Sequence, residues 1–150
     1  MSNVNNALDA SNQPAEFWVG IEQFNRGEYY ACHNTMEVIW MNAQIINKGL
    51  YQGILQIAVG LYHLTNFNWQ GAAILLGEGI NRLNAYEDNY GGIDIAQLTQ
   101  QAIDWLTALQ ETGPDHVQKL AAILVVTPLE PENQTIAYRY QLEPPQIQGI

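Results

Sequence analysis

Positively charged side chains are scarce in this sequence. Its 150 residues include five Lys and Arg against 15 Asp and Glu, which gives a formal net charge of −10 at pH 7. The five basic residues are scattered along the chain, whereas binding to nucleic-acid phosphates requires clustered Lys and Arg. The same deficit disfavours an anionic membrane surface. We therefore expect neither a nucleic-acid partner nor a membrane partner for this acidic protein.

Cysteine and long apolar runs are also scarce. Cys32 is the one cysteine, so no disulfide can form within the chain. The longest apolar stretch, residues 54–64, is too short to span a bilayer and is interrupted by Gln56 and His63. The first residues lack the basic and apolar segments of a signal peptide. These features predict a cytoplasmic protein in a reducing compartment.

Charge of either sign is low, at 13% of the residues, about half the usual share. Between Tyr29 and Gly77 the formally charged residues are Glu37 and Lys48. A carboxylate that is buried without a partner costs several kcal/mol or takes up a proton, so Glu37 needs a partner if it is buried. The low surface charge is also compatible with self-association into a homo-oligomer.

Apolar residues recur at helical spacing through most of the chain, which predicts an all-α protein. We expect a bundle of about five helices within one domain, residues 14–126, with helices near 14–25, 28–42, 50–67, 69–86 and 94–112. Residues 117–126 fit either a short helix or a helix that passes into an extended segment. Residues 1–13 are predicted to form a flexible N-terminus, and the Pro-rich residues 127–150 an extended C-terminal tail. Apolar residues of the tail alternate as in a strand: Ile136, Tyr138, Tyr140 and Leu142.

The helix predicted over residues 28–42 carries the main candidate site. His33, Glu37 and Trp40 share one face, because residues three and four apart are neighbours on a helix. The same side carries four further large side chains: Tyr29, Tyr30, Met36 and Met41. The opposite side carries Glu28, Cys32, Thr35 and Asn42. We expect the aromatic side, with His33 and Glu37 in its middle, to be buried.

The helix predicted over residues 50–67 is apolar nearly all round, which is typical of a central, buried helix. Gln52, Gln56 and His63 lie on one narrow stripe of it. Gly53 and Gly60 lie beside that stripe and permit the close approach of another backbone. We interpret the stripe as the surface that faces the helix at 28–42. The sequence then predicts a polar cluster between these two helices, on the same face as Trp40: His33, Glu37, Gln52, Gln56 and His63.

The predicted cluster admits more than one chemistry. His33, Glu37 and His63 can in principle bind a divalent metal such as iron or zinc, with Gln56 supporting them. Buried polar groups are more often a hydrogen-bond network that fixes the helix register, and the spacing is not the His-Glu-x-x-His of zinc hydrolases. Acid–base catalysis by Glu37 lacks a partnered nucleophile, because Cys32 points away from His33.

We therefore expect a non-enzymatic protein that binds a small molecule or another protein and needs no cofactor. The alternative is a metal-dependent, hydrolase-like enzyme that uses His33, Glu37 and His63. The four tryptophans lie at core-facing positions, so we interpret them as packing residues rather than as a ligand cage.

Several segments resemble a known family. Its signature is similar to the run Phe24-Asn25-Arg26-Gly27-Glu28-Tyr29-Tyr30 followed by His33-x-x-x-Glu37-x-x-Trp40. A second block resembles residues 51–58 with His63, and a third resembles Asn68 with Gly71 and Ala72. The family is domain of unknown function 309, small all-helical proteins of bacteria and archaea, and the resemblance covers roughly residues 17–110. It implies a helical fold and a site at these positions, and it implies no particular activity. One departure is Asn34, where the family often has Glu.

Overall fold

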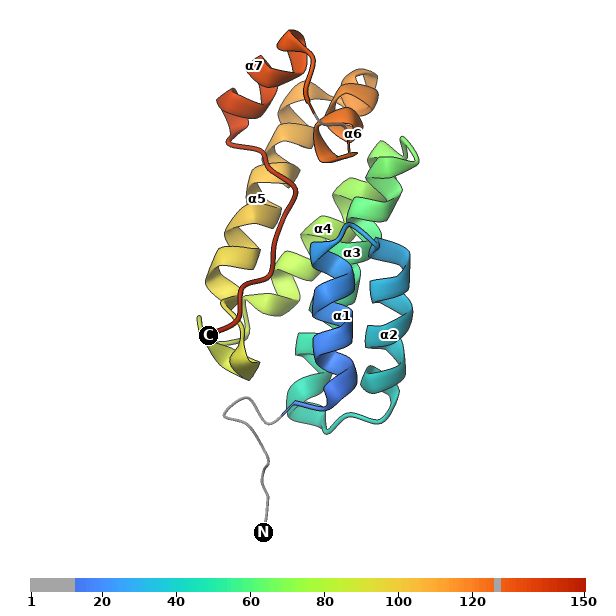
Figure 1. Ribbon diagram of the computed structural model, residues 1–150, viewed down its shortest axis with the longest axis vertical. Helices are drawn as coiled ribbons and strands as arrows, with labels where there is room; N and C mark the ends of the chain where they lie inside the picture. Colours follow the sequence, from blue (N-terminus) through green and yellow to red (C-terminus); the bar gives the residue numbers. More distant parts are fainter. Residues whose placement is uncertain (1–12, 126–127) are drawn as a thin grey trace.

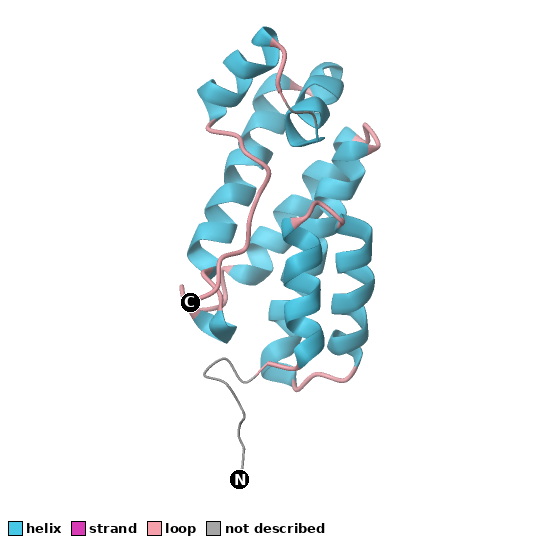
Figure 2. Cartoon of the chain, viewed as in Figure 1, coloured by secondary structure: helices cyan, strands magenta, loops and turns pink. Residues whose placement is uncertain are grey.

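The computed structural model describes residues 13–125 and 128–150, and these residues form seven α-helices and two short 3-10 turns (Figures 1 and 2). The helices are α1 (Ala15–Asn25), α2 (Tyr29–Met41), α3 (Ile45–Thr65), α4 (Trp69–Leu83), α5 (Ile95–Thr112), α6 (Val117–Val125) and α7 (Pro131–Tyr140). The only strand-like pairing in the described ranges is an isolated antiparallel bridge between Ile93 and Gly149. The all-α prediction is confirmed, with more helices than the expected five. The predicted flexible N-terminus lies outside the described residues except for Gln13.

Side-chain caps fix the first turns of two helices. The Asn68 side chain accepts a hydrogen bond from the Gly71 N–H at 2.9 Å and so caps α4. The Asp94 side chain accepts one from the Gln97 N–H at 3.0 Å and caps α5. The third helix begins at Ile45 rather than at residue 50. The first turn was missed because its apolar side chains, Ile45 and Ile46, are exposed and do not continue the buried face of the helix.

The central helix of the molecule is α3. It packs against α2 on one side and α4 on the other, while α1 covers α2 and α5 packs against α4. Among the described residues of α3, five large apolar side chains are fully buried: Leu50, Ile54, Ile57, Leu61 and Leu64. This burial confirms that the apolar run predicts a core helix. No helix among the described residues has the length and apolar character needed to cross a membrane.

The glycines of α3 face α4, which corrects the prediction that their side of the helix faces α2. A Cβ atom on Gly53 would lie 2.7 Å from Leu83 Cδ2, and one on Gly60 would lie 3.0 Å from the backbone nitrogen of Leu76. From the other helix, a Cβ on Gly79 would lie 2.9 Å from the carbonyl oxygen of Gly53. The two helices approach so closely because neither carries a side chain at these points. The close contact therefore belongs to the α3–α4 pair.

The C-terminal region differs most from the prediction. Residues 131–140 form α7, so Ile136, Tyr138 and Tyr140 lie on a helix and not on a strand. Pro131 stands in the first turn, where its fixed φ favours a helix, and Gln141 ends the helix with φ 58°. None of the residues of α7 is fully buried. A helix without a buried apolar face shows little apolar periodicity in its sequence, which is why it was not predicted. Of the two alternatives for residues 117–126, the short helix is the one observed, over Val117–Val125.

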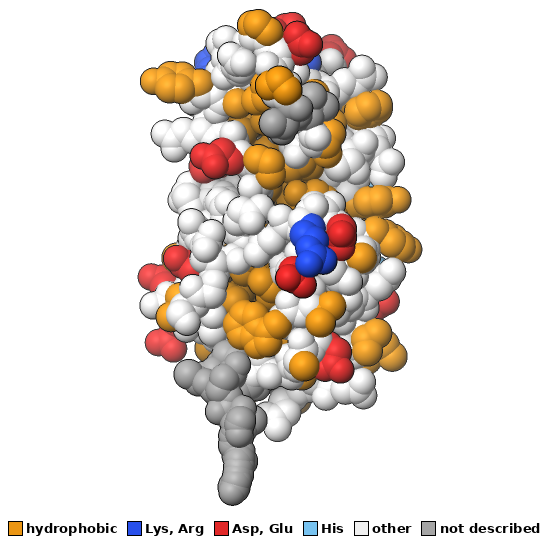
Figure 3. Space-filling model, in the orientation of Figure 1, with side chains coloured by type: hydrophobic (Ala, Val, Ile, Leu, Met, Phe, Trp, Pro, Cys, Tyr) orange, Lys and Arg blue, Asp and Glu red, His pale blue; other side chains and the backbone are white. Residues whose placement is uncertain are grey.

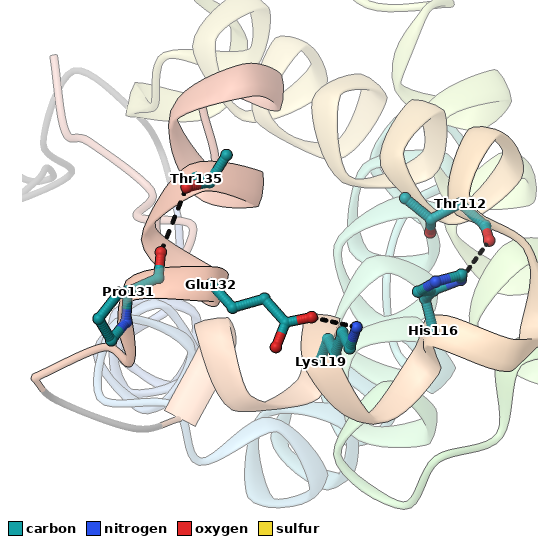
Figure 4. A network of polar contacts seen from close by, with 6 residues as sticks. All are labelled: Thr112, His116, Lys119, Pro131, Glu132 and Thr135. Carbon is teal, nitrogen blue, oxygen red and sulfur yellow. Dashed lines mark hydrogen bonds and ion pairs between the residues drawn. The ribbon is translucent and has the colours of Figure 1, made fainter.

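Polar contacts at this end of the molecule are on the surface (Figure 4). An ion pair joins Lys119 of α6 to Glu132 of α7, and the Thr135 hydroxyl donates to the Pro131 carbonyl within α7. The His116 Nδ1 lies 2.8 Å from the carbonyl oxygen of Thr112 at the end of α5. The side chains of Lys119 and Glu132 are both exposed, and exposed ion pairs contribute little to stability. Besides the ion pair, α7 packs against the core through three partly buried side chains, Ile136, Ala137 and Tyr140.

Candidate functional site

The buried face of α2 overlaps only partly with the predicted one: Tyr29 and Met36 are buried as expected, but His33 and Glu37 are not. Its buried residues follow helical spacing: Tyr29, Cys32, Met36 and Ile39. The side chain of Glu37 is 54% exposed and that of His33 is 21% exposed, so the prediction that both lie in a buried face is wrong. The aromatic side chains misled the prediction, because a tyrosine at the surface is common, whereas cysteine is among the most buried residue types.

Cys32 and Tyr29 belong to the core. Burial raises the pKa of the Cys32 thiol to about 12 and also raises the pKa of the Tyr29 hydroxyl. A thiol with such a pKa is protonated at neutral pH, and the thiolate is the nucleophilic form. Cys32 is therefore a packing residue.

His33 and Glu37 form a surface pair. Their closest atoms, His33 Nε2 and Glu37 Oε2, are 3.9 Å apart, at the outer limit of an ion pair. The other ring nitrogen of His33 lies 3.1 Å from the side-chain oxygen of Asn34, the residue that departs from the family pattern. Exposed pairs of this kind contribute about 0–1 kcal/mol to stability. The pair is too exposed to act as the buried anchor of the fold.

A row of aromatic rings links this pair to α3. The ring centroids of His33 and Tyr30 are 5.7 Å apart, those of Tyr30 and Tyr62 are 5.2 Å apart, and those of Tyr62 and His63 are 6.4 Å apart. Tyr30 is 54% exposed and Tyr62 is 37% exposed. We call the resulting surface the tyrosine face and define it by five residues: Tyr30, His33, Glu37, Tyr62 and His63. Sequence reasoning missed Tyr62, because a tyrosine in an apolar helix resembles a core residue.

Trp40 lies at the other end of α2, where α3 begins. The Lys48 ammonium is 4.4 Å from the centre of its ring and donates a hydrogen bond to the Trp40 carbonyl at 2.9 Å. This contact combines a cation–π interaction with a positive charge at the C-terminus of α2. The indole N–H is buried and has no partner among the described residues. Trp40 thus belongs to the α2–α3 junction rather than to the pair formed by His33 and Glu37.

The glutamines and His63 have partners other than those predicted. Gln56 is buried, and its Nε2 lies 3.4 Å from the carboxylate of Glu78 on α4, so it faces α4. Its side-chain oxygen has no hydrogen-bond partner in the described part of the chain. His63 lies 3.4 Å from the side-chain amide of Asn68, and Gln52 is half-buried on α3. The structure therefore does not join the predicted cluster into one hydrogen-bonded network.

The three candidate metal ligands are not gathered either. Within residues 13–125 and 128–150, no three His, Cys, Asp or Glu side chains are placed to hold a metal ion together. His33 and His63 share the tyrosine face, but Tyr30 and Tyr62 lie between them in the row of rings. The donor set expected for iron or zinc is thus not assembled by this geometry.

A separate hollow lies where α1 begins and α2 ends. Its volume is about 370 Å³, and its walls are mostly apolar or amide-bearing: Pro14, Glu16, Val38, Ile39, Asn42, Ala43, Gln44, Asn47 and Tyr51. Burial raises the pKa of Tyr51 to about 12, with smaller contributions from Tyr90 and Tyr86, so its hydroxyl stays protonated at neutral pH. The hollow offers apolar contacts and amide groups rather than a set of catalytic groups.

Among known protein families, the one described as domain of unknown function (DUF309) matches residues 17–75. The match spans α1, α2, α3 and about half of α4, so it contains the whole tyrosine face and ends before the predicted limit near residue 110. No curated protein and no solved structure matches the chain. The segments expected from the resemblance at His33, Glu37, Trp40 and His63 all lie inside the matched range. Residues 17–75 of the chain are therefore similar to the DUF309 family.

Proposed function

We propose that the chain is a non-enzymatic binding protein and that the tyrosine face contacts a protein partner. The observation that carries the proposal is the pair of exposed tyrosines, Tyr30 and Tyr62, which contact each other across two helices with ring centroids 5.2 Å apart and ring planes tilted by 43°. Tyrosine is enriched at protein interfaces, where it supplies a large contact area and a polar hydroxyl. Small-molecule sites are usually enclosed, whereas these rings stand on the outside of α2 and α3.

Charge indicates the chemistry of the partner. The chain carries a net charge of −10, and the tyrosine face includes the exposed carboxylate of Glu37. Figure 3 shows the same imbalance on one side of the molecule, where Lys and Arg side chains are few and hydrophobic side chains reach the surface between neutral ones. Aromatic faces attract cations, and complementary charge speeds association. A partner surface with exposed Arg or Lys fits this combination.

The hydrolase-like alternative has less support from the site. His33, Glu37 and His63 are not arranged as one ligand set, and the single thiol is buried. The exposed tyrosines have no evident role in such an enzyme. Binding without chemistry accounts for the same residues more simply.

Removal of the two tyrosine rings tests the proposal. In the Tyr30→Ala/Tyr62→Ala variant we expect binding to a partner to weaken by roughly 30-fold or more, because central tyrosines often contribute 2 kcal/mol or more to an interface. A partner is first captured by chemical crosslinking in the native cells and then purified, and its Kd is measured by calorimetry.

The matched control is Val19→Ala/Ile74→Ala, which removes two equally exposed apolar side chains from α1 and α4. This control variant should bind the partner as the unchanged chain does. Both variants should also keep the melting temperature of the unchanged chain to within a few degrees. If the tyrosine variant binds the purified partner with an unchanged Kd, the tyrosine face is not the binding surface.

A further inference from the structure

The last residues of the chain are bound in the manner of an extended peptide. Residues 142–150 run back along α5, antiparallel to it, in the space between α5 and α1 (Figure 1). We call residues 142–150 the tail. We call the surface that receives it the tail groove and define it by Asn25 of α1 with Gln101 and Trp105 of α5.

Side chains of the groove pair with the backbone of the tail. Asn25 donates from Nδ2 to the Ile147 carbonyl at 3.0 Å and accepts from the Ile147 N–H at 2.6 Å. Gln101 makes the same double contact with the backbone of Gln146, at 2.8 and 3.0 Å. The Trp105 indole donates to the Glu143 carbonyl at 2.9 Å. Such contacts recognise an extended backbone whatever side chains it carries.

Three side chains of the tail are buried and add to these backbone contacts. Leu142, Pro145 and Ile147 are buried, whereas their neighbours Glu143, Pro144 and Gln148 are exposed. Backbone hydrogen bonds together with pockets for selected side chains are the two parts of peptide recognition in an extended conformation. The groove therefore fits the pattern Leu-x-x-Pro-x-Ile.

The tail follows a helix, α7, that has only partly buried contacts with the core. None of the residues of α7 is fully buried, and its ion pair with α6, between Glu132 and Lys119, lies on the surface (Figure 4). Segments with few buried contacts open at a lower free energy than the core does. The contacts of α1 with α2, α2 with α3, α3 with α4 and α4 with α5 do not involve the tail, so these helices can stay packed when it is released.

We propose that the tail groove is a peptide-binding site, filled in one molecule by its own tail and able to receive the tail of a second copy of this chain. The second copy is the occupant because its tail carries the sequence that fits the three buried positions. In an isolated molecule the attached tail outcompetes the tail of another molecule for the groove, since its local concentration is on the order of millimolar. Exchange therefore becomes visible when one molecule has a defective tail and the other has a defective groove.

Two full-length variants test the exchange. Ile147→Asp places a charge in the buried position of the tail and leaves the groove intact, whereas Asn25→Ala breaks the groove and leaves the tail intact. We expect each variant alone to be monomeric by light scattering and the equimolar mixture to form a 1:1 complex. A mixture that contains only monomers contradicts the second copy as occupant.

A labelled peptide with the sequence of residues 141–150 tests the groove itself. By fluorescence anisotropy, the Ile147→Asp chain should bind this peptide at least roughly tenfold more tightly than the unchanged chain, whose own tail competes. A peptide with Gln148→Ala, a change at an exposed position, should bind equally well, and one with Ile147→Asp should not bind. Equal binding of the Ile147→Asp peptide overturns the proposal.

The proposal can still be tested if a variant fails to fold. If the Ile147→Asp chain is unfolded, the added peptide should restore its helical circular-dichroism signal, because binding to the folded state stabilises that state. Absence of recovery at saturating peptide contradicts a site that accepts the tail in trans. The Asn25→Ala chain should show no such recovery, because its groove lacks the amide that pairs with Ile147.

Discussion

Replacement of Gly79 by alanine is expected to lower the free energy of unfolding by about 2–4 kcal/mol, a large effect for the addition of one methyl group. The new Cβ would lie 2.6 Å from Ile57 Cγ1, 2.9 Å from the Gly53 carbonyl oxygen and 3.1 Å from the Ile57 nitrogen. Two of these atoms are backbone atoms of the central helix, so they cannot move aside as a flexible side chain would. The α3–α4 contact must therefore loosen.

Gly77, in the same helix, provides the control. A Cβ there would find only Leu106 Cδ2 nearby, at 3.9 Å, which is an ordinary contact. Gly77→Ala should raise the free energy of unfolding by up to about 1 kcal/mol, because alanine is the better helix former. Urea unfolding of both variants measures the two values. Equal effects at positions 77 and 79 would contradict the close approach of α3 and α4.

Asn25→Ala should lower the free energy of unfolding by about 2–4 kcal/mol, because each buried backbone group left without a partner costs about 1–3 kcal/mol. The substitution leaves both the N–H and the carbonyl of Ile147 without their side-chain partner. The expected loss is one of tail docking, so the Ile147 amide should also exchange its hydrogen faster in the variant. Urea unfolding and hydrogen exchange measured by NMR check the two parts.

Asn42→Ala is the matched control for Asn25→Ala. Asn42 is exposed, and its side chain makes a longer hydrogen bond, 3.3 Å to the Val38 carbonyl in its own helix. Its removal should change the free energy of unfolding by less than about 0.5 kcal/mol. A cost for Asn25→Ala as small as this would mean that the tail is held by its apolar side chains alone.

Local rules predicted much of the helical framework. The caps at Asn68 and Asp94 depend on side chains that lie within three residues of the groups they bind, so the sequence contains all the information needed. The apolar run of α3 likewise lies in the local sequence, so it predicts a helix surrounded by protein. The short helix α7 was missed because its stability depends on a surface that other helices provide, and its own side chains show little periodicity.

The orientation of each helix was harder to predict than its position. On α2, two patterns compete: an aromatic face with Tyr30 and Trp40, and a smaller face with Cys32 and Ile39. Periodicity alone does not decide between them, because the outcome depends on which surface α1 and α3 present. On α3, glycines indicate close contact but do not name the neighbour, which proves to be α4. The candidate residues were thus assigned to the correct helices, but the burial of their side chains and their contact partners were predicted incorrectly.

The family match covers the tyrosine face but not the whole tail groove. It covers residues 17–75, which contain all five residues of that surface, and it excludes the tail and α5. The tail groove combines Asn25 from inside the matched range with Gln101 and Trp105 from outside it. The tyrosine face therefore lies within the matched range, whereas the tail groove depends partly on segments outside it.

The central claim is that His33 and Glu37 serve a binding surface and do not hold the fold together. The most direct test is the free energy of unfolding of the His33→Ala/Glu37→Ala variant, measured by urea titration at pH 7. The exposed, 3.9 Å contact between the two side chains predicts a change of less than about 1 kcal/mol. A loss of about 3 kcal/mol or more is what a broken buried ion pair produces, and it would contradict the claim.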